Sequence, residues 1–223
     1  QEVLALDRRA HSPLGEARTH FMLATLAQTL GDARERIRHL DAAHARLKDV
    51  GPKVAYGSLI GQEYARAGEL AKARSVESTI APLVDPKNPE QTGYLSLLKG
   101  EIARAGKDWS AAVSLLALDD PLFGNMVPAI AAESLANAHR EAGDLDASIR
   151  YFEDVIRTPS ALVSWEPQQR WVLAHFTLAQ VYLEKGETAK ARRTLGKLLD
   201  IWKGADTTIP FLQQAQAEYA KLR

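Results

Sequence analysis

The sequence predicts an all-α fold made of repeated helix pairs, and three observations predict it. A short glycine phrase recurs along the 223 residues, apolar residues at helical spacing flank it, and the ten prolines can all be placed outside helix interiors. Alternation of apolar and polar residues, which is typical of strands, is absent from the flanking segments. A chain of this length is ample for one folded unit or a short array of repeats.

The recurring phrase is a glycine followed by a polar residue, and in four of five cases that residue is an acid. The five phrases are Gly31-Asp32, Gly68-Glu69, Gly106-Lys107, Gly143-Asp144 and Gly186-Glu187. Glycine readily takes the left-handed conformation that ends a helix. An acid is favourable at the positively polarised start of the next helix. Each phrase therefore predicts a turn that joins two helices.

The helix pairs follow in order along the chain. The ranges expected for them are 14–50, 52–84, 88–120, 127–159 and 167–203, and a capping helix is expected over 208–222. Apolar residues repeat at helical spacing before Gly143 (Ile130, Leu135) and after it (Ile149, Phe152). Seven prolines fall between pairs or at the ends of their ranges, Pro13 and Pro210 lie near helix starts, and Pro82 is expected to end the second helix of its pair. A solenoid needs the capping helix to cover its last apolar face.

These residues resemble the tetratricopeptide repeat (TPR) family, in which a small residue, an aromatic residue, a glycine-acid turn and a second small residue recur in register. The second to fifth pairs match best, and the first matches least because Arg36 stands where a small residue is expected. The matching residues are Gly61, Tyr64 and Ala73; Gly100, Asp108-Trp109 and Ala112; Ala136, Ser148, Phe152 and Pro159; and Ala179, Tyr182 and Ala191. In the third pair the turn glycine comes one place early.

The resemblance implies a right-handed α-α superhelix whose first helices line a concave groove that binds a peptide or protein partner. Mapped from each glycine, the groove side chains expected to contact that partner are Arg18, Phe21, Gln28, Gln62, Arg66, Tyr94, Glu101, Arg104, Asn137, Arg140, Phe176 and Gln180. The same mapping also places Thr25, Ser58, Leu97 and Glu133 at groove positions. Polar side chains of this kind can hydrogen-bond an extended peptide while an aromatic residue anchors it. The alternative is that they are ordinary exposed helix residues. Only Asn137 and Arg140 suggest the clamp with which some relatives hold a C-terminal carboxylate.

Two linkers are unusually apolar for loops, the first around Phe123 and the second around Trp165. Exposed apolar side chains in loops are candidate contacts for a partner or for a second copy of the chain, so a homo-oligomer is possible. The alternative is that both side chains fold back and cover helix ends.

Composition and motifs argue against several other functions. Lys and Arg together number 28, as do Asp and Glu, so no excess positive charge points to nucleic acid. The absence of cysteine excludes thiolate catalysis and cysteine-ligated zinc, and no apolar run is long enough to insert into a membrane. No nucleophile elbow, HExxH pair or GxGxxG turn appears, and His39 and His44 have the wrong spacing for a helical metal site. We therefore expect no catalytic residue, cofactor or metal.

A second hypothesis comes from the closing stretch, from Leu199 to Leu222, which resembles the ends of TPR tails in multi-domain bacterial signalling proteins. Those tails follow a serine/threonine kinase or a winged-helix DNA-binding domain. This resemblance implies a sensor or oligomerisation region of a larger protein, of which Gln1 would be an internal position. It leaves open whether the region is cytoplasmic or extracytoplasmic.

Overall fold

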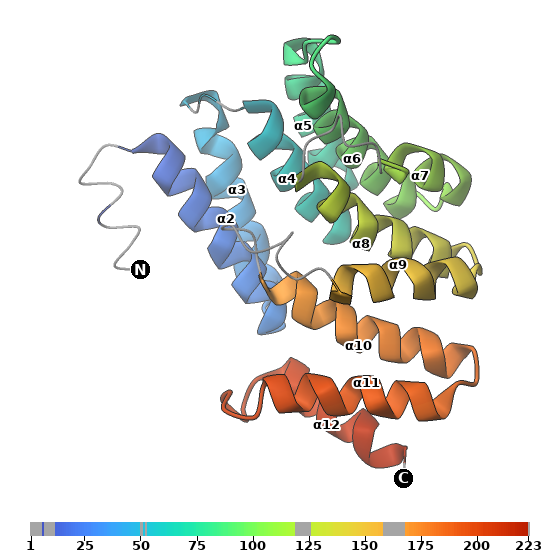
Figure 1. Cartoon of the computed structure of the whole chain (residues 1–223). Coiled ribbons are helices and arrows are strands. Elements are labelled where there is room, and N and C mark those ends of the chain that lie inside the picture. The colour runs from blue at the N-terminus through green and yellow to red at the C-terminus, as the bar shows by residue number, and fades with distance from the viewer. Residues whose placement is uncertain are drawn as a thin grey trace.

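The all-α prediction is confirmed. A computed structural model describes residues 6, 12–49, 51, 53–118, 126–157 and 168–222, and within those ranges it contains eleven helices, two short 3-10 turns and no strand. Figure 1 shows the helices in chain order from α2 to α12. None of the helices in these ranges meets the length and apolarity that a bilayer crossing requires.

The helices come in consecutive pairs, each joined by one of the glycine phrases. Their bounds are α2 (Pro13–Thr29) and α3 (Ala33–Arg46); α4 (Lys53–Arg66) and α5 (Leu70–Ile80); α6 (Pro89–Ala105) and α7 (Trp109–Leu116); α8 (Met126–Glu141) and α9 (Leu145–Arg157); and α10 (Gln168–Glu184) and α11 (Thr188–Ile201). The last helix is α12 (Pro210–Lys221), and short turns η1 (Leu47–Asp49) and η2 (Ala81–Leu83) follow α3 and α5. Pro82 lies in η2, so α5 ends just before it, as expected.

The turns show why the glycine phrase recurs. Gly31, Gly68, Gly143 and Gly186 have φ angles of 72°, 83°, 88° and 80°, which L side chains rarely adopt. In the third turn Gly106 has an ordinary φ of −80°, and Lys107 takes the left-handed conformation at 64°. The early glycine in that phrase therefore leaves a strained lysine at the turn.

Acid caps start three of the second helices. The side chains of Asp32, Asp108 and Asp144 each accept a hydrogen bond from a backbone N–H three residues later, at 3.0, 3.1 and 3.0 Å. Glu69 and Glu187 occupy the same place but make no such bond. In the third pair the capping acid is Asp108 rather than the residue after the glycine, because the turn there is displaced by one residue.

Small residues allow the helices to approach closely, as their positions predict. A Cβ atom placed on Gly57 would lie 2.5 Å from Ile80 Cγ2, and one on Gly100 would lie 2.6 Å from Leu116 Cγ. Both distances are shorter than real side chains tolerate. The two glycines therefore set the spacing between the first and second helices of their pairs.

Alanine at Gly100 and at Gly196 should have opposite effects on stability. Both glycines lie inside helices, where alanine alone is worth up to about 1 kcal/mol over glycine. At Gly196 the nearest atom to a new Cβ is 3.6 Å away, so Gly196→Ala should raise the free energy of unfolding. At Gly100 the clash with Leu116 should outweigh that gain and cost about 1–2 kcal/mol net. Urea unfolding of the two variants checks this, and a stabilised Gly100→Ala would contradict the close approach.

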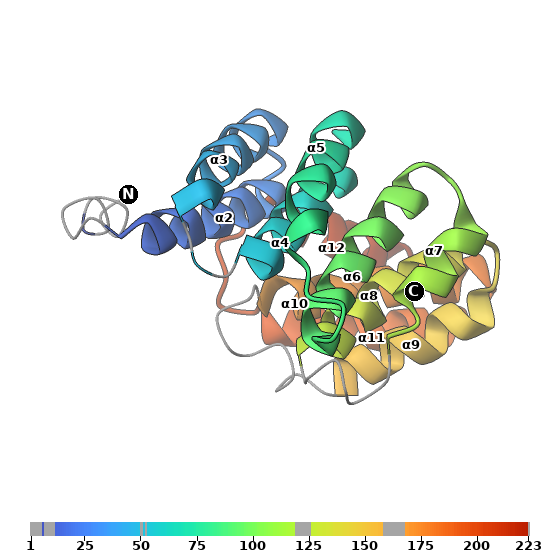
Figure 2. The ribbon, with the colours of Figure 1, turned by 90° about the horizontal axis from the view of Figure 1, so that it is seen from above.

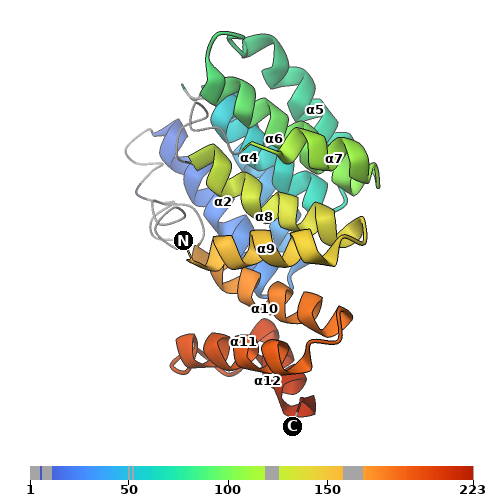
Figure 3. The ribbon, with the colours of Figure 1, turned by 45° about the vertical axis from the view of Figure 1, so that its right-hand side comes forward.

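The pairs pack one after another. Each first helix contacts its own second helix, α4 also contacts α6, and α9 contacts α10. Viewed from above, α3, α5, α7 and α9 lie towards the periphery, whereas α4, α6, α8 and α10 lie nearer the middle (Figure 2). Figure 3 shows α11 and α12 at one end of the stack. Phe211 of α12 packs edge-on against Phe176 and Trp202, so α12 covers the apolar end of α10 and α11.

The same tyrosine–carboxylate hydrogen bond joins successive helix pairs at two places. The Tyr64 hydroxyl donates to Asp41 Oδ1 of the preceding pair at 2.7 Å, and Lys72 Nζ lies 5.4 Å from the ring centroid. The Tyr182 hydroxyl donates to Glu153 at 2.5 Å, with Lys190 Nζ at 5.3 Å from its ring. The second and fifth pairs are thus attached to their predecessors in the same way, which supports an internal repeat.

Candidate functional site

The inner sides of the first helices carry a cluster of charged residues that we call the charge cluster. Its members come from α3, α4, α6, α8 and α10, and they are linked by ion pairs. They are Arg36, Glu63, Arg66, Glu101, Arg104, Glu133, Glu141 and Arg170. Four arginines face four glutamates, so the cluster has no net charge.

Glu101 stands at the centre of the cluster and is fully buried. Its Oε1 accepts hydrogen bonds from Arg66 Nε at 3.1 Å and Nη2 at 2.9 Å, while its Oε2 accepts one from Arg104 Nε at 2.9 Å. Arg66 also donates to Ser134 Oγ at 2.8 Å. Through Arg66 and Glu101 the first helices of the second, third and fourth pairs are therefore connected.

Glu63 is the second buried carboxylate and receives arginines from three helices. Arg36 Nη2 lies 2.7 Å from Oε2, and Arg170 Nη2 and Arg66 Nη1 lie 2.6 and 3.3 Å from Oε1. Arg170 also lies 3.3 Å from Glu133 Oε2. The start of α10 is thereby held against both α4 and α8.

The ion pairs continue towards solvent at the ends of the first helices. Arg104 Nη1 lies 2.5 Å from Glu141 Oε1, and Arg140 Nη2 lies 2.5 Å from Glu184 Oε1. Arg140 also donates to Gln180 at 3.3 Å. The side chain of Arg140 is 24% exposed, whereas that of Arg66 is 11% exposed. The inner face, formed by the inner sides of α4, α6, α8 and α10, is therefore more accessible to solvent near Arg140 than near Arg66.

The surroundings fix the charge of the cluster at neutral pH. Burial alone would raise the pKa of Glu63, but Arg170, Arg66 and Arg36 outweigh burial and lower this pKa to about 2. Burial opposes ionisation of Glu101 as well, yet Arg66 and Arg104 hold its pKa below the ordinary value. Burial likewise opposes the charge of Arg66, and Glu101, Glu133 and Glu63 nevertheless raise its pKa. All three groups are therefore charged near neutral pH. They can attract and hydrogen-bond a ligand, but they do not exchange a proton with it at that pH.

Four residues mapped to the groove, Arg66, Glu101, Arg104 and Glu133, belong to the charge cluster. Gln62 and Tyr94 are both buried, and Ser58 links them. Its Oγ donates to the backbone carbonyl of Tyr94 at 2.5 Å and accepts from Gln62 Nε2 at 3.1 Å. Tyr94 also lines a hollow of about 390 Å³ between the starts of α4 and α6. Within this set Arg66 and Arg104 both bind Glu101, so the charged residues predicted to meet a partner bind one another instead.

The other predicted groove residues are scattered. Asn137 and Gln180 are half-buried near Arg140, and Asn137 Nδ2 donates to the Glu133 carbonyl at 3.0 Å. Phe21 and Phe176 are buried, the latter against α12, so neither side chain faces solvent in this conformation. Two more are exposed on α2, namely Arg18 and Gln28. The loop candidates Phe123 and Trp165 lie outside the described residues.

The groove mapping did not select four members of the cluster: Arg36, Glu63, Glu141 and Arg170. The spacing of Glu63 to Arg66 and of Glu101 to Arg104 is the signal that could have found part of it, since residues three apart on a helix are neighbours. No spacing in the sequence could reveal Arg170, because 107 residues separate it from Glu63.

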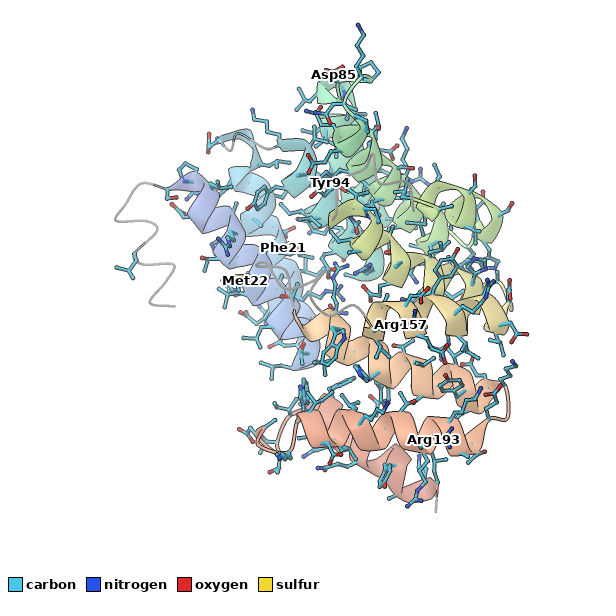
Figure 4. All side chains as sticks on the ribbon, viewed as in Figure 1. Phe21, Met22, Asp85, Tyr94, Arg157 and Arg193 are labelled. Atoms are coloured by element: carbon cyan, nitrogen blue, oxygen red, sulfur yellow. The ribbon has the colours of Figure 1, made fainter. Side chains whose placement is uncertain are left out.

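The α2 helix bears a row of exposed apolar side chains on the side away from the core. Leu14, Met22, Leu26 and Leu30 are 39%, 46%, 43% and 46% exposed, and they follow one another at multiples of four residues. Phe21, next to Met22, is only 1% exposed (Figure 4). Large apolar side chains grouped on a surface mark interaction sites, so this α2 row is a second candidate surface.

His39 of α3 is buried, with 8% of its surface exposed. Its Nδ1 lies 2.9 Å from Nδ1 of His20, so the two rings share one proton between those atoms. Its Nε2 lies 3.1 Å from Arg38 and 3.7 Å from Glu35. Burial, followed by the charge of Arg38, lowers the pKa of His39 from 6.5.

The histidine pair predicts that the first helix pair loosens in mild acid. Because the pKa of His39 is lower in the folded chain, the unfolded chain binds more protons as the pH falls through 6.5, and stability falls with it. The protection factors of amides in α2 and α3, which are exchange rates corrected for the pH dependence of free amides, should therefore fall between neutral pH and about pH 5, and His39→Gln should weaken this fall. Protection factors that stay constant over this range in the unchanged chain would contradict the shared proton.

Comparison with known proteins adds no family. No protein-family model matches the chain. A search of curated proteins finds no match either. Within the described ranges, no group of three or more His, Asp or Glu side chains is arranged to hold a metal ion.

Proposed function

We propose that the chain is a non-catalytic protein–protein interaction module of the TPR type. It binds a peptide or protein segment along the inner face of α4, α6, α8 and α10. The polar groups of this face come from four successive helix pairs, which is the arrangement needed to follow an extended segment residue by residue.

The charge cluster carries this proposal. Burying several arginines and glutamates is an expensive way to hold helices together, because apolar side chains of similar size are often equally stabilising or more so. Gln62 adds to that cost, since its buried Oε1 has no hydrogen-bond partner in the described part of the chain. A polar interior of this kind is better explained by recognition of polar groups than by stability.

The accessible end of the face allows a direct test. Peptides are selected from a displayed random library on the unchanged chain, and their affinities are then measured for Asn137→Ala/Arg140→Ala/Gln180→Ala. We expect at least about tenfold weaker binding, which corresponds to 1.4 kcal/mol. Arg193→Ala, an exposed change on α11 (Figure 4), is the matched control and should bind as the unchanged chain does. Equal affinity of the triple variant would contradict binding on the inner face.

The second candidate function is an oligomerisation region of a larger bacterial signalling protein. The α2 row favours it, because exposed apolar side chains on one side of a helix, here Met22 and Leu26, suit packing against another helix. Sedimentation should then show a dimer that Met22→Glu/Leu26→Glu dissociates. A monomer at every concentration would remove this candidate and leave the inner-face proposal standing.

A further inference from the structure

Arg170 is the residue that closes the charge cluster. It lies in the first turn of α10, yet it contacts Glu63 of α4 at 2.6 Å and Glu133 of α8 at 3.3 Å. Its side chain is only 7% exposed. The guanidinium therefore occupies the space between the inner sides of α4 and α8, where the proposed function places a bound segment.

The charges around Arg170 are balanced only when it is present. Without it, the cluster consists of three arginines (Arg36, Arg66, Arg104) and four glutamates (Glu63, Glu101, Glu133, Glu141). Without Arg170, Glu133 would keep an ion pair with Arg66, whose Nη2 lies 3.6 Å from Glu133 Oε2. Glu63 would still face Arg36 and Arg66, but one negative charge of the cluster would be unbalanced, and this favours another cation in the vacated site.

The geometry selects a guanidinium group rather than an ammonium. Two different nitrogens, Nη2 and Nη1, reach two carboxylates that belong to different helices. A planar fork spans such a pair, whereas an ammonium is a single point charge that is more strongly hydrated. The chemistry of the site is therefore that of an arginine side chain.

We infer that Glu63 and Glu133 form a guanidinium-binding site, that Arg170 occupies it as an internal competitor, and that an arginine of a partner segment takes it when the start of α10 moves away. This inference rests on the proposed function and adds the partner's chemistry to it. It also makes the contact between α10 and α4 autoinhibitory, because Arg170 closes the part of the inner face between α4 and α8 and leaves only the end near Arg140 accessible.

The site is tested with a ligand that replaces the missing atoms. Arg170→Ala removes an ethylguanidinium group, so millimolar ethylguanidinium should raise the thermal midpoint of this variant of the 223-residue chain. The unchanged chain should not respond, and Arg170→Ala/Glu133→Gln should respond less because its charges are already balanced. Ethylammonium is the control compound. An Arg170→Ala midpoint that rises no more than that of the unchanged chain, or rises equally with ethylammonium, would overturn the site.

Folding of the variant need not be assumed. If Arg170→Ala is unfolded alone, recovery of helical circular dichroism with ethylguanidinium but not with ethylammonium supports the site. Failure to recover with either compound overturns it, because a site that accepts an external guanidinium must regain part of the lost stability.

The partner's chemistry is tested with two short peptides that differ only in a central arginine or lysine. We expect the arginine peptide to bind Arg170→Ala at least about tenfold more tightly than the unchanged chain, and more tightly than the lysine peptide. Recovery by ethylguanidinium without peptide binding would overturn the partner's role and keep the site. The two proposals can fail separately. If library peptides bind the inner face but ethylguanidinium does not raise the thermal midpoint of Arg170→Ala, this inference is overturned and the proposed function stands.

Discussion

Replacing Glu101 by glutamine is expected to lower the free energy of unfolding by about 3–5 kcal/mol, the usual cost of removing one partner from a buried ion pair. The carboxylate is fully buried and accepts hydrogen bonds from both Arg66 and Arg104. In Glu101→Gln two buried guanidinium groups would face a neutral amide, which can accept through only one of its atoms. Urea unfolding at neutral pH gives the value.

The matched control is Glu35→Gln on the surface of α3, where the carboxylate pairs with Arg38 but is 42% exposed. That change should cost far less than Glu101→Gln, because exposed pairs are screened by solvent. The double variant Arg66→Met/Glu101→Leu should recover part of the loss, because it removes charge of both signs. A loss for Glu101→Gln as small as that for Glu35→Gln would show that the buried cluster does not exist as described.

The second large effect expected is a fall in stability in acid. The pKa of Glu63 is about 2 in the folded chain against 4.5 for the free group. A carboxyl group with a lowered pKa stabilises the fold above its unfolded pKa, and that stability is lost as the pH falls from 4.5 towards 2. Denaturant unfolding at a series of pH values over this range should show the decline.

Glu63→Gln identifies the source of this decline. The variant should be less stable at neutral pH, because it lacks the favourable ionised form, and its stability should change less between pH 4.5 and 2. High salt should reduce the decline only slightly, since buried pairs are poorly screened. A variant with the same pH dependence as the unchanged chain would mean that Glu63 is not held by Arg36, Arg66 and Arg170.

The elements could be predicted from the sequence because their signals are local. Gly31, Gly68, Gly143 and Gly186 end helices through their own backbone conformation, so the phrase that contains them marks each turn directly. In the third turn the glycine marks the position to within one residue: Gly106 comes one place early, and Lys107 takes the left-handed conformation.

The candidate site could be predicted only in part, because most of its contacts are not local. Arg66, Glu101 and Arg104 were placed on the inner side from their positions relative to the glycines, and all three lie in the cluster. Their burial and mutual pairing depend on how closely the first helices approach, which periodicity does not specify. Arg170 was missed because its partners are set by the path of the whole chain back to α4.

The same limit applies to the side chains expected to face a partner. Phe176 has the spacing of a groove residue, but α12 returns to cover it through Phe211. Met22 and Leu26 have the spacing of an ordinary amphipathic helix, and only the packing of α2 shows that they are left exposed. Helix periodicity identifies a face, whereas the neighbouring elements decide whether that face is covered.

Contact between the second and fifth helix pairs closes the inner face between α4 and α8, and a double-mutant cycle tests this contact most directly. The free energy of unfolding is measured for the unchanged chain, Glu63→Gln, Arg170→Gln and the double variant. Residues in contact within an ion-pair network couple by about 0.5–3 kcal/mol, and we expect a value in the upper half of that range for this buried pair. A coupling energy of zero within error would mean that Arg170 and Glu63 do not meet, and the inner face would then be open.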